Sequence, residues 1–224
     1  MTSPAAHPFT RSPGWLTVAS GAPEVGLGAA FLVTWVDPAR FGTSMVSFAL
    51  ELMLLEFILI HSAGFMGVRA AKAGSARARV IVIVGLGLFY SLFVGGFCLA
   101  LGRVRPLVSF WIVTAQRLAG DLLDPKPGEE TRAWFGTNLA MNAILYLLLA
   151  GATVMLPVPA LGITSPVREA VGVAGRGLWV DEPQRVVVLA GLYYLVRGVM
   201  TVGAWPRRAF PARDTIAGQL KADA

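Results

Sequence analysis

Glu51, Glu56 and His61 lie inside a single apolar stretch, residues 44–68, with the sequence SMVSFALELMLLEFILIHSAGFMGV. A helix of about 20 apolar residues crosses the hydrocarbon core of a bilayer, so this stretch is long enough to do so. An ionisable side chain at bilayer depth costs at least about 2.5–3.5 kcal/mol on insertion scales. Three of them in one helix therefore need partners or a chemical purpose, such as binding a proton or a cation.

The spacing of these three residues points their side chains in three directions. At about 100° per residue, Glu56 lies about 140° and His61 about 80° from Glu51 around the helix. Ser47 and Ser62 fall within about 40° of Glu51 and give it a polar side. A helix that contacts lipid on one side can point one of these three side chains toward neighbouring helices, but not all three. We therefore expect this helix to be enclosed by other helices.

Four more polar residues lie within other apolar stretches. They are Glu24 in residues 15–36, Asn138 and Asn142 in residues 135–156, and Arg197 in residues 185–204. Counted along each helix at about 1.5 Å per residue, Glu24, Glu56 and Arg197 fall near the bilayer midplane. By the same count, Glu51 lies toward the outside, whereas His61 and both asparagines lie toward the cytoplasm.

Two interpretations of these seven residues differ in function. In the first, Glu56 pairs with Arg197 and ties two helices together, while Asn138 and Asn142 form interhelical hydrogen bonds. In the second, the residues form a proton or cation path. Three carboxylates cannot be neutralised pairwise by one arginine and one histidine, so one carboxylate is protonated, hydrated or bound to a cation. The sequence thus predicts either proton- or cation-coupled transport or a structural subunit of a membrane complex.

An intramembrane enzyme that acts on a lipid or isoprenoid is the alternative hypothesis, with Glu51, Glu56 and His61 as acid–base groups. The sequence contains no H-E-x-x-H motif, no G-x-S-x-G motif and no phosphate-binding P-loop. The single cysteine, Cys98, rules out a multi-cysteine metal site. The two histidines are His61 and His7 of the proline-rich N-terminal segment, so a haem held between two histidines in the membrane is not expected. We expect no cofactor and no metal.

The composition indicates an all-α polytopic transmembrane helix bundle. Hydrophobic residues make up 55% of the chain and charged residues 14%, whereas soluble domains contain about 25% charged residues. We expect a flexible tail at 1–14, one transmembrane domain at 15–204 and a basic tail at 205–224. The six predicted spans are residues 15–36, 44–68, 80–101, 107–119, 135–156 and 185–204. The connection at 157–184 is expected to be a plain loop, with a short interfacial helix around Val167 to Gly175 as the alternative.

Positive charge sets the predicted orientation. The short loop with Arg69, Lys72, Arg77 and Arg79 should be cytoplasmic by the positive-inside rule. If residues 107–119 span, twelve of the nineteen lysines and arginines lie on the cytoplasmic side and both termini are cytoplasmic. We therefore expect a multi-pass protein of the cytoplasmic (inner) membrane. Its expected partners are the lipid bilayer and other membrane subunits or a second copy, but not nucleic acid, because the basic residues lie at helix ends.

A stripe of small residues marks the third predicted span. Gly87, Ser91, Gly95 and Cys98 recur at helical spacing within residues 80–101. Small residues let two helices approach closely in a membrane, so this stripe predicts a close-packing face.

Overall fold

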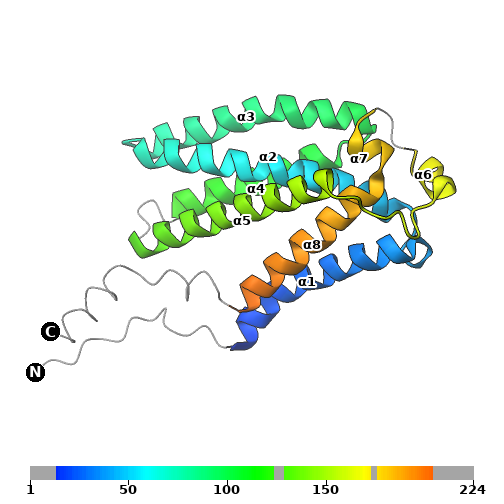
Figure 1. The fold of residues 1–224 in the computed structure, drawn as a ribbon. Coiled ribbons are helices and arrows are strands. Elements are labelled where there is room, and N and C mark those ends of the chain that lie inside the picture. Colours follow the sequence, from blue (N-terminus) through cyan, green and yellow to red (C-terminus); the bar gives the residue numbers. More distant parts are fainter. Residues whose placement is uncertain (1–13, 124–128, 173–175, 204–224) are drawn as a thin grey trace, which may run out of the picture.

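The computed structural model describes residues 14–123, 129–172 and 176–203, and these residues are helical or lie in short connections (Figure 1). The elements, in chain order, are α1 (Gly14–Val36), the 3-10 turn η1 (Pro38–Arg40), α2 (Ser44–Lys72), α3 (Ala76–Leu101), α4 (Arg105–Leu123), α5 (Glu129–Met155), α6 (Ser165–Val171), α7 (Leu178–Asp181) and α8 (Pro183–Val202). The predicted all-α class is confirmed for this part of the chain.

The six long helices alternate in direction through the bundle (Figure 1). The start of α1, the turn at residues 73–75 and the end of α8 lie together at what we call the terminal end. The turn η1, the α3–α4 connection, α6 and α7 lie at the opposite end, called the connector end. Short connections of this kind force consecutive helices to run antiparallel.

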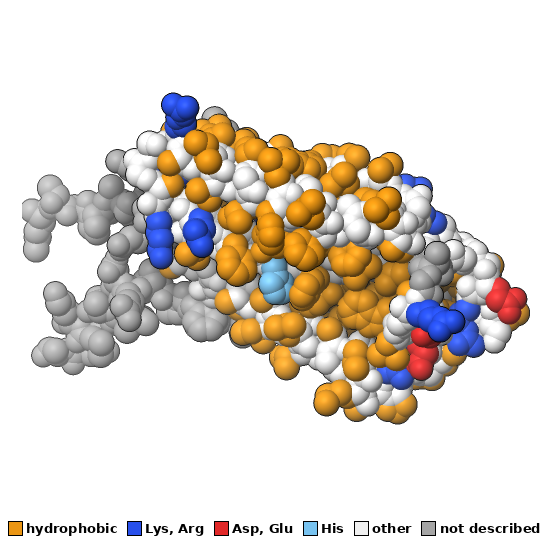
Figure 2. All heavy atoms as spheres, turned by 90° about the horizontal axis from the view of Figure 1, so that it is seen from above, with side chains coloured by type: hydrophobic (Ala, Val, Ile, Leu, Met, Phe, Trp, Pro, Cys, Tyr) orange, Lys and Arg blue, Asp and Glu red, His pale blue; other side chains and the backbone are white. Residues whose placement is uncertain are grey.

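Four helices are long and apolar enough to cross a membrane: Ser44–Ala70 of α2, Ala76–Leu101 of α3, Phe135–Met155 of α5 and Pro183–Val202 of α8. In α1 the apolar part is shorter, Gly21–Val36. The helix α4 has 19 residues and begins with an arginine, and it does not reach the same hydropathy. Figure 2 shows an apolar belt between charged groups at both ends of one face. These features support a membrane-embedded helical protein.

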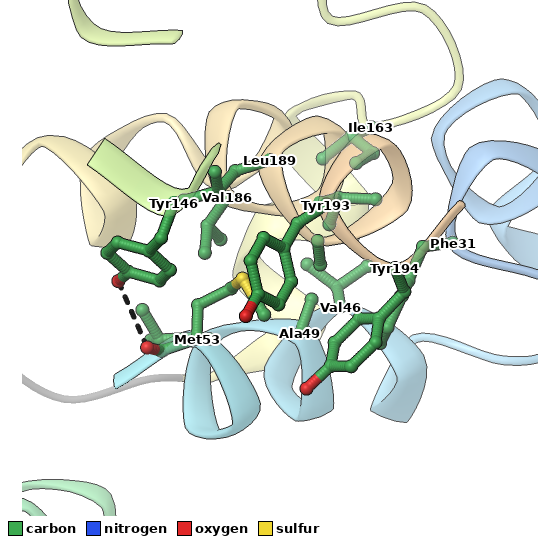
Figure 3. Packing of buried hydrophobic residues seen from close by; sticks show 13 residues of the cluster. Phe31, Val46, Ala49, Met53, Tyr146, Ile163, Val186, Leu189, Tyr193 and Tyr194 are labelled. Atoms are coloured by element: carbon green, nitrogen blue, oxygen red, sulfur yellow. Dashed lines mark hydrogen bonds between the residues drawn. The ribbon is translucent and has the colours of Figure 1, made fainter. Parts of the chain in front are cut away.

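Helix α2 lies at the centre of the packing. On one side, α1, α2, α5 and α8 enclose a core that includes Phe31, Met53, Tyr146 and Tyr193 (Figure 3). On the other side, α2, α3 and α4 enclose a second core. Because α2 contributes to both cores, its polar residues face neighbours on two opposite sides.

The expectation of a plain loop at 157–184 is wrong, because this segment contains α6 and α7. Pro166 occupies the first turn of α6, where its fixed φ favours a helix and its missing N–H costs nothing. Val167, Val171, Trp179 and Val180 pack against the first core. The two short helices therefore form where their apolar side chains cover the connector end of the bundle.

Candidate functional site

Close contact between α1 and α8 places Glu24 beside Arg197. Gly21 and Gly28 lie seven residues apart on α1, and Gly191 and Gly198 lie seven apart on the antiparallel α8. A methyl group at Gly21 would stand 2.7 Å from the Gly198 carbonyl oxygen, and one at Gly198 would stand 2.7 Å from Val25 N.

A methyl group at Gly28 would likewise overlap the backbone of α8. The two backbones therefore touch at both pairs of glycines, as small residues permit between membrane helices. Glu24 and Arg197 lie between these two contacts.

Arg197 binds two carboxylates from two other helices. Its Nη1 donates to Glu56 Oε1 of α2 at 2.7 Å, and its Nε lies 3.1 Å from Glu24 Oε1 of α1. The side chains of Arg197 and Glu24 are 29% and 22% exposed, and that of Glu56 is 12% exposed. The Glu56–Arg197 pair expected from the sequence is present, and Glu24 joins it.

Glu56 accepts more hydrogen bonds than Glu24. The Tyr193 hydroxyl donates to Glu56 Oε1 at 2.7 Å, and the Tyr194 hydroxyl donates to Oε2 at 3.3 Å. Figure 3 shows both tyrosines pointing from α8 toward α2. With Arg197, three donors reach this carboxylate, which suits an ionised acceptor. Glu24 receives Arg197 and only a long contact of 3.5 Å from the Thr201 hydroxyl.

We call this group the carboxylate–arginine cluster; its members are Glu24, Glu56, Tyr193, Tyr194, Arg197 and Thr201. Tyr193 and Tyr194 were not among the residues that the sequence indicated for this site. The side chains of adjacent residues on a helix point about 100° apart. The two tyrosines nevertheless reach the same carboxylate, because each hydroxyl bonds a different oxygen of Glu56. The signal that could have found them is their position one turn before Arg197, at the same depth as Glu56.

Glu51 belongs to a separate site. It forms an ion pair with Arg103, whose Nη1 also donates to Ser47 Oγ at 3.3 Å. Arg103 follows Gly102, which ends α3 in the left-handed conformation at φ 64° and turns the chain back toward α2. The predicted spans 80–101 and 107–119 left Arg103 in the connection between them. The expectation that Glu51 contributes to an excess of carboxylate is therefore wrong, because Arg103 neutralises it.

A third arginine holds α4 against α2. Arg117 Nη1 donates to Ser62 Oγ and Nη2 to the Leu59 carbonyl, both at 2.9 Å. Among the described residues no carboxylate contacts it. This contact was not predicted from the sequence, although Phe110, Thr114 and Arg117 share one face of a helix at i, i+4 and i+7.

His61 lies outside the cluster and on the outer surface of the bundle. Its Nδ1 stands 3.0 Å from the Phe57 carbonyl oxygen, and the two rings are 4.3 Å apart. The expectation that other helices enclose α2 is therefore wrong for this side. Because α2 is covered by α8 and α5 on one flank and by α3 and α4 on the other, a strip of it stays open.

Asn138 and Asn142 are half-buried on α5. Within the part of the chain that the structure describes, neither side chain forms a hydrogen bond, so the expected interhelical bonds are not present there. The structure thus brings together Glu24, Glu56 and Arg197, and leaves Glu51, His61 and the asparagines apart. The acid–base set of the enzyme hypothesis, Glu51, Glu56 and His61, is divided among three different surroundings.

No protein-family model, curated protein or solved structure matches this chain.

Proposed function

We propose that the protein is a multi-pass protein of the cytoplasmic membrane that binds and transfers protons through the carboxylate–arginine cluster, as part of proton-coupled transport. The observation that carries the proposal is that two carboxylates, Glu24 and Glu56, share one guanidinium, Arg197. In a medium of low dielectric constant the excess negative charge is costly, and a proton or a cation removes it.

Six spans with both termini in the cytoplasm are the arrangement that this proposal uses. The alternation of the six long helices supports it, since α1 begins and α8 ends at the terminal end (Figure 1). Arg69, Lys72 and Arg77 also lie at that end, at or beside the turn between α2 and α3. Positive charge favours the cytoplasmic side, so the terminal end is assigned to the cytoplasm.

Glu24 is the proton-binding carboxylate in this proposal. Glu56 is held by three donors, and protonation there would cost the bonds from Tyr193 and Arg197. Protonation of Glu24 breaks only its contact with Arg197, which keeps its pair with Glu56. The arginine is therefore never left without an anion, and a proton can be taken up and released at a low electrostatic cost.

The burial of α8 makes access to the cluster one-sided. All buried residues of α8 except Gly198 precede Leu195, so this helix is sealed toward the connector end. The cluster residues Arg197 and Glu24 retain 29% and 22% exposure. We infer that Glu24 exchanges protons with the terminal end, which we assign to the cytoplasm, because the buried part of α8 lies toward the connector end.

Reconstitution into liposomes tests the proposal. With a potassium diffusion potential and a trapped pH-sensitive dye, the wild-type protein should move protons, and Glu24→Gln should not. The amide can still accept from Thr201 and Arg197, so the variant should fold. Glu169→Gln, an exposed carboxylate on α6, is the matched control and should transport as the wild type does. Equal flux in Glu24→Gln and the wild type, or no flux from either, would exclude the proposal.

A structural subunit of a membrane complex is the second candidate. Arg117 favours it, because this arginine ties α4 to α2 through a hydroxyl and a carbonyl and serves no carboxylate. A protein with this role alone should keep its fold in Glu24→Gln and show no proton flux in the liposome assay.

A further inference from the structure

The helices α1 and α8 are in close contact along most of their length. Gly21 and Gly28 of α1 bring its backbone against that of α8 at two levels, and Arg197 pairs with Glu24 between them. Figure 1 shows the two helices side by side from the connector end to the terminal end. Closely packed backbones leave little room for one helix to shift without the other. The two helices, called the α1–α8 pair, should therefore move together.

The α1–α8 pair is tied to the rest of the bundle at the connector end. Arg185 Nη1, in the first turn of α8, donates to the carbonyl oxygens of Thr153 and Leu156 at the end of α5, at 2.6 Å and 2.9 Å. Trp35 Nε1, near the end of α1, donates to the Pro159 carbonyl oxygen at 2.8 Å, in the segment that follows α5. Both helices of the pair are thus anchored beside the end of α5.

Toward the terminal end the pair runs away from α5. Figure 1 shows α8 close to α5 near the connector end and separated from it near the terminal end. Burial changes in the same direction. Tyr146 of α5 and Tyr193 of α8 are 4% and 0% exposed, whereas Asn142 and Arg197, one turn nearer the terminal end, are half-buried. The two helices are therefore packed together mainly between Tyr146 and the connector end.

Two asparagines of α5 lie at the levels of two polar residues of α8. The rings of Tyr146 and Tyr193 are 5.8 Å apart and set the register of these antiparallel helices. Four and eight residues from these tyrosines toward the terminal end, the residues at matching levels are Asn142 with Arg197 and Asn138 with Thr201.

The asparagines also lie on the side of α5 that faces α8. Around α5, Asn142 lies about 40° and Asn138 about 80° from Tyr146. On the opposite side of Tyr146, Ala143 and Leu147 line a small cavity against α2. Because α2 is on that side, the asparagines are turned toward α8.

The facing groups are able to bond to one another. Neither asparagine amide forms a hydrogen bond within the described part of the chain, and amides without partners at this depth are costly. Arg197 uses Nη1 for Glu56 and Nε for Glu24, so Nη2 has N–H groups left to donate. The Thr201 hydroxyl donates to the Arg197 carbonyl oxygen and can still accept a hydrogen bond.

We propose that the α1–α8 pair swings about the connector end and closes against α5, as a hinged unit does. In the closed conformation Asn142 accepts a hydrogen bond from Arg197 Nη2, and Asn138 donates one to the Thr201 hydroxyl. Closure covers the exposed edges of Arg197 and Glu24, so Glu24 no longer meets the terminal end. The movement adds a change of access to the proposed function. Because it is measured as a distance, it can be found in a protein that moves no protons.

Distances between pairs of spin labels test the movement in liposomes. Labels on Ala140→Cys of α5 and Val199→Cys of α8, both exposed positions, should give two distances in a Cys98→Ser background. Labels on Val33→Cys of α1 and Val199→Cys should give a single distance, since both lie on the α1–α8 pair. This second combination is the matched control.

Substitutions at the closing contacts should shift the balance between the two distances. Asn142→Ala and Asn138→Ala should each lower the ratio of the short to the long distance by about two- to tenfold, the effect of one hydrogen bond. Gln116→Ala removes an exposed amide from α4 and should leave the ratio unchanged. Thermal unfolding checks that each variant is folded, and Thr201→Val removes the same contact from the α8 side if an asparagine variant is unstable.

Three results would overturn the proposal. The first is a single distance between the labels on α5 and α8, whether short or long. The second is a ratio of the two distances that is the same in the wild type, both asparagine variants and Thr201→Val. The third is two distances between the labels on α1 and α8, which would show that these helices do not move together. Two distances between α5 and α8 without any proton flux would keep the movement and exclude only the proposed function.

Discussion

The pair α1–α8 and the pair α3–α4 both contain glycines at helical spacing, yet they pack in different ways. Between α1 and α8 the glycines bring two backbones into contact. Between α3 and α4, Gly87 meets only the side chains of Trp111 and Thr114, at 3.2 Å and 3.3 Å. A methyl group at Gly95 would meet nothing within 4 Å. Glycines thus permit close packing, but the partner helix decides whether it occurs.

The two pairs also differ in what they present to their surroundings. The outer side of α3 is apolar, with Leu88, Leu92 and Leu99 exposed at 59%, 73% and 87%. The pair α1–α8 instead carries Glu24 and Arg197 between its glycine contacts. The close approach of α1 lets a short acidic side chain reach Arg197, which a looser pair would not allow. The cluster therefore depends on the tight pair, whereas the loose pair presents an apolar outer surface.

Removal of the shared arginine, Arg197, should lower the free energy of unfolding most. Arg197→Ala leaves Glu24 and Glu56 without a cation, and breaking a buried ion pair in this way costs about 3–5 kcal/mol in soluble cores. Arg117→Ala, the matched change on the α4 side, frees only a hydroxyl and a carbonyl and should cost about 1–3 kcal/mol. Unfolding in detergent measures both. Equal stability of Arg197→Ala and the wild type would contradict the pairing.

Leucine substitutions at glycine should sharpen the contrast between the two pairs. Gly198→Leu forces α1 and α8 apart and should cost about 1–3 kcal/mol or more, since overpacking a tight contact has this effect. Gly95→Leu, on the open side of α3, should change the unfolding temperature little. A larger loss of stability in Gly95→Leu than in Gly198→Leu would reverse the comparison.

Removal of a tyrosine hydroxyl should lower the free energy of unfolding least. Tyr194→Phe removes a hydrogen bond of 3.3 Å to Glu56, a loss of about 0.5–1.5 kcal/mol. Tyr90→Phe on α3, outside the cluster, should leave stability unchanged. The same unfolding assay in detergent compares the two variants. An equal loss of stability in Tyr90→Phe and Tyr194→Phe would show that the hydrogen bond from Tyr194 to Glu56 contributes nothing of its own.

The sequence predicts the Glu56–Arg197 pair because charges at one depth in a membrane need each other. It does not predict that Arg103 reaches Glu51, since this depends on the left-handed turn at Gly102 and on a long side chain extending from a loop. It places the close-packing glycines on α3, whereas the closest contact is between α1 and α8, because the residues of one helix do not reveal its partner. The exposure of His61 was missed for the same reason.

The central claim is that Glu24 takes up and releases the proton of the cluster, and infrared spectroscopy of the carboxyl C=O stretch tests it directly. In a difference spectrum between higher and lower pH, the wild-type protein should show the band of a carboxylic acid that takes up a proton in an apolar environment. The band should be absent from Glu24→Gln and retained in the control Glu169→Gln. A band that persists in Glu24→Gln and vanishes in Glu56→Gln would place the proton on Glu56. The absence of any such band from the wild type would contradict the account outright.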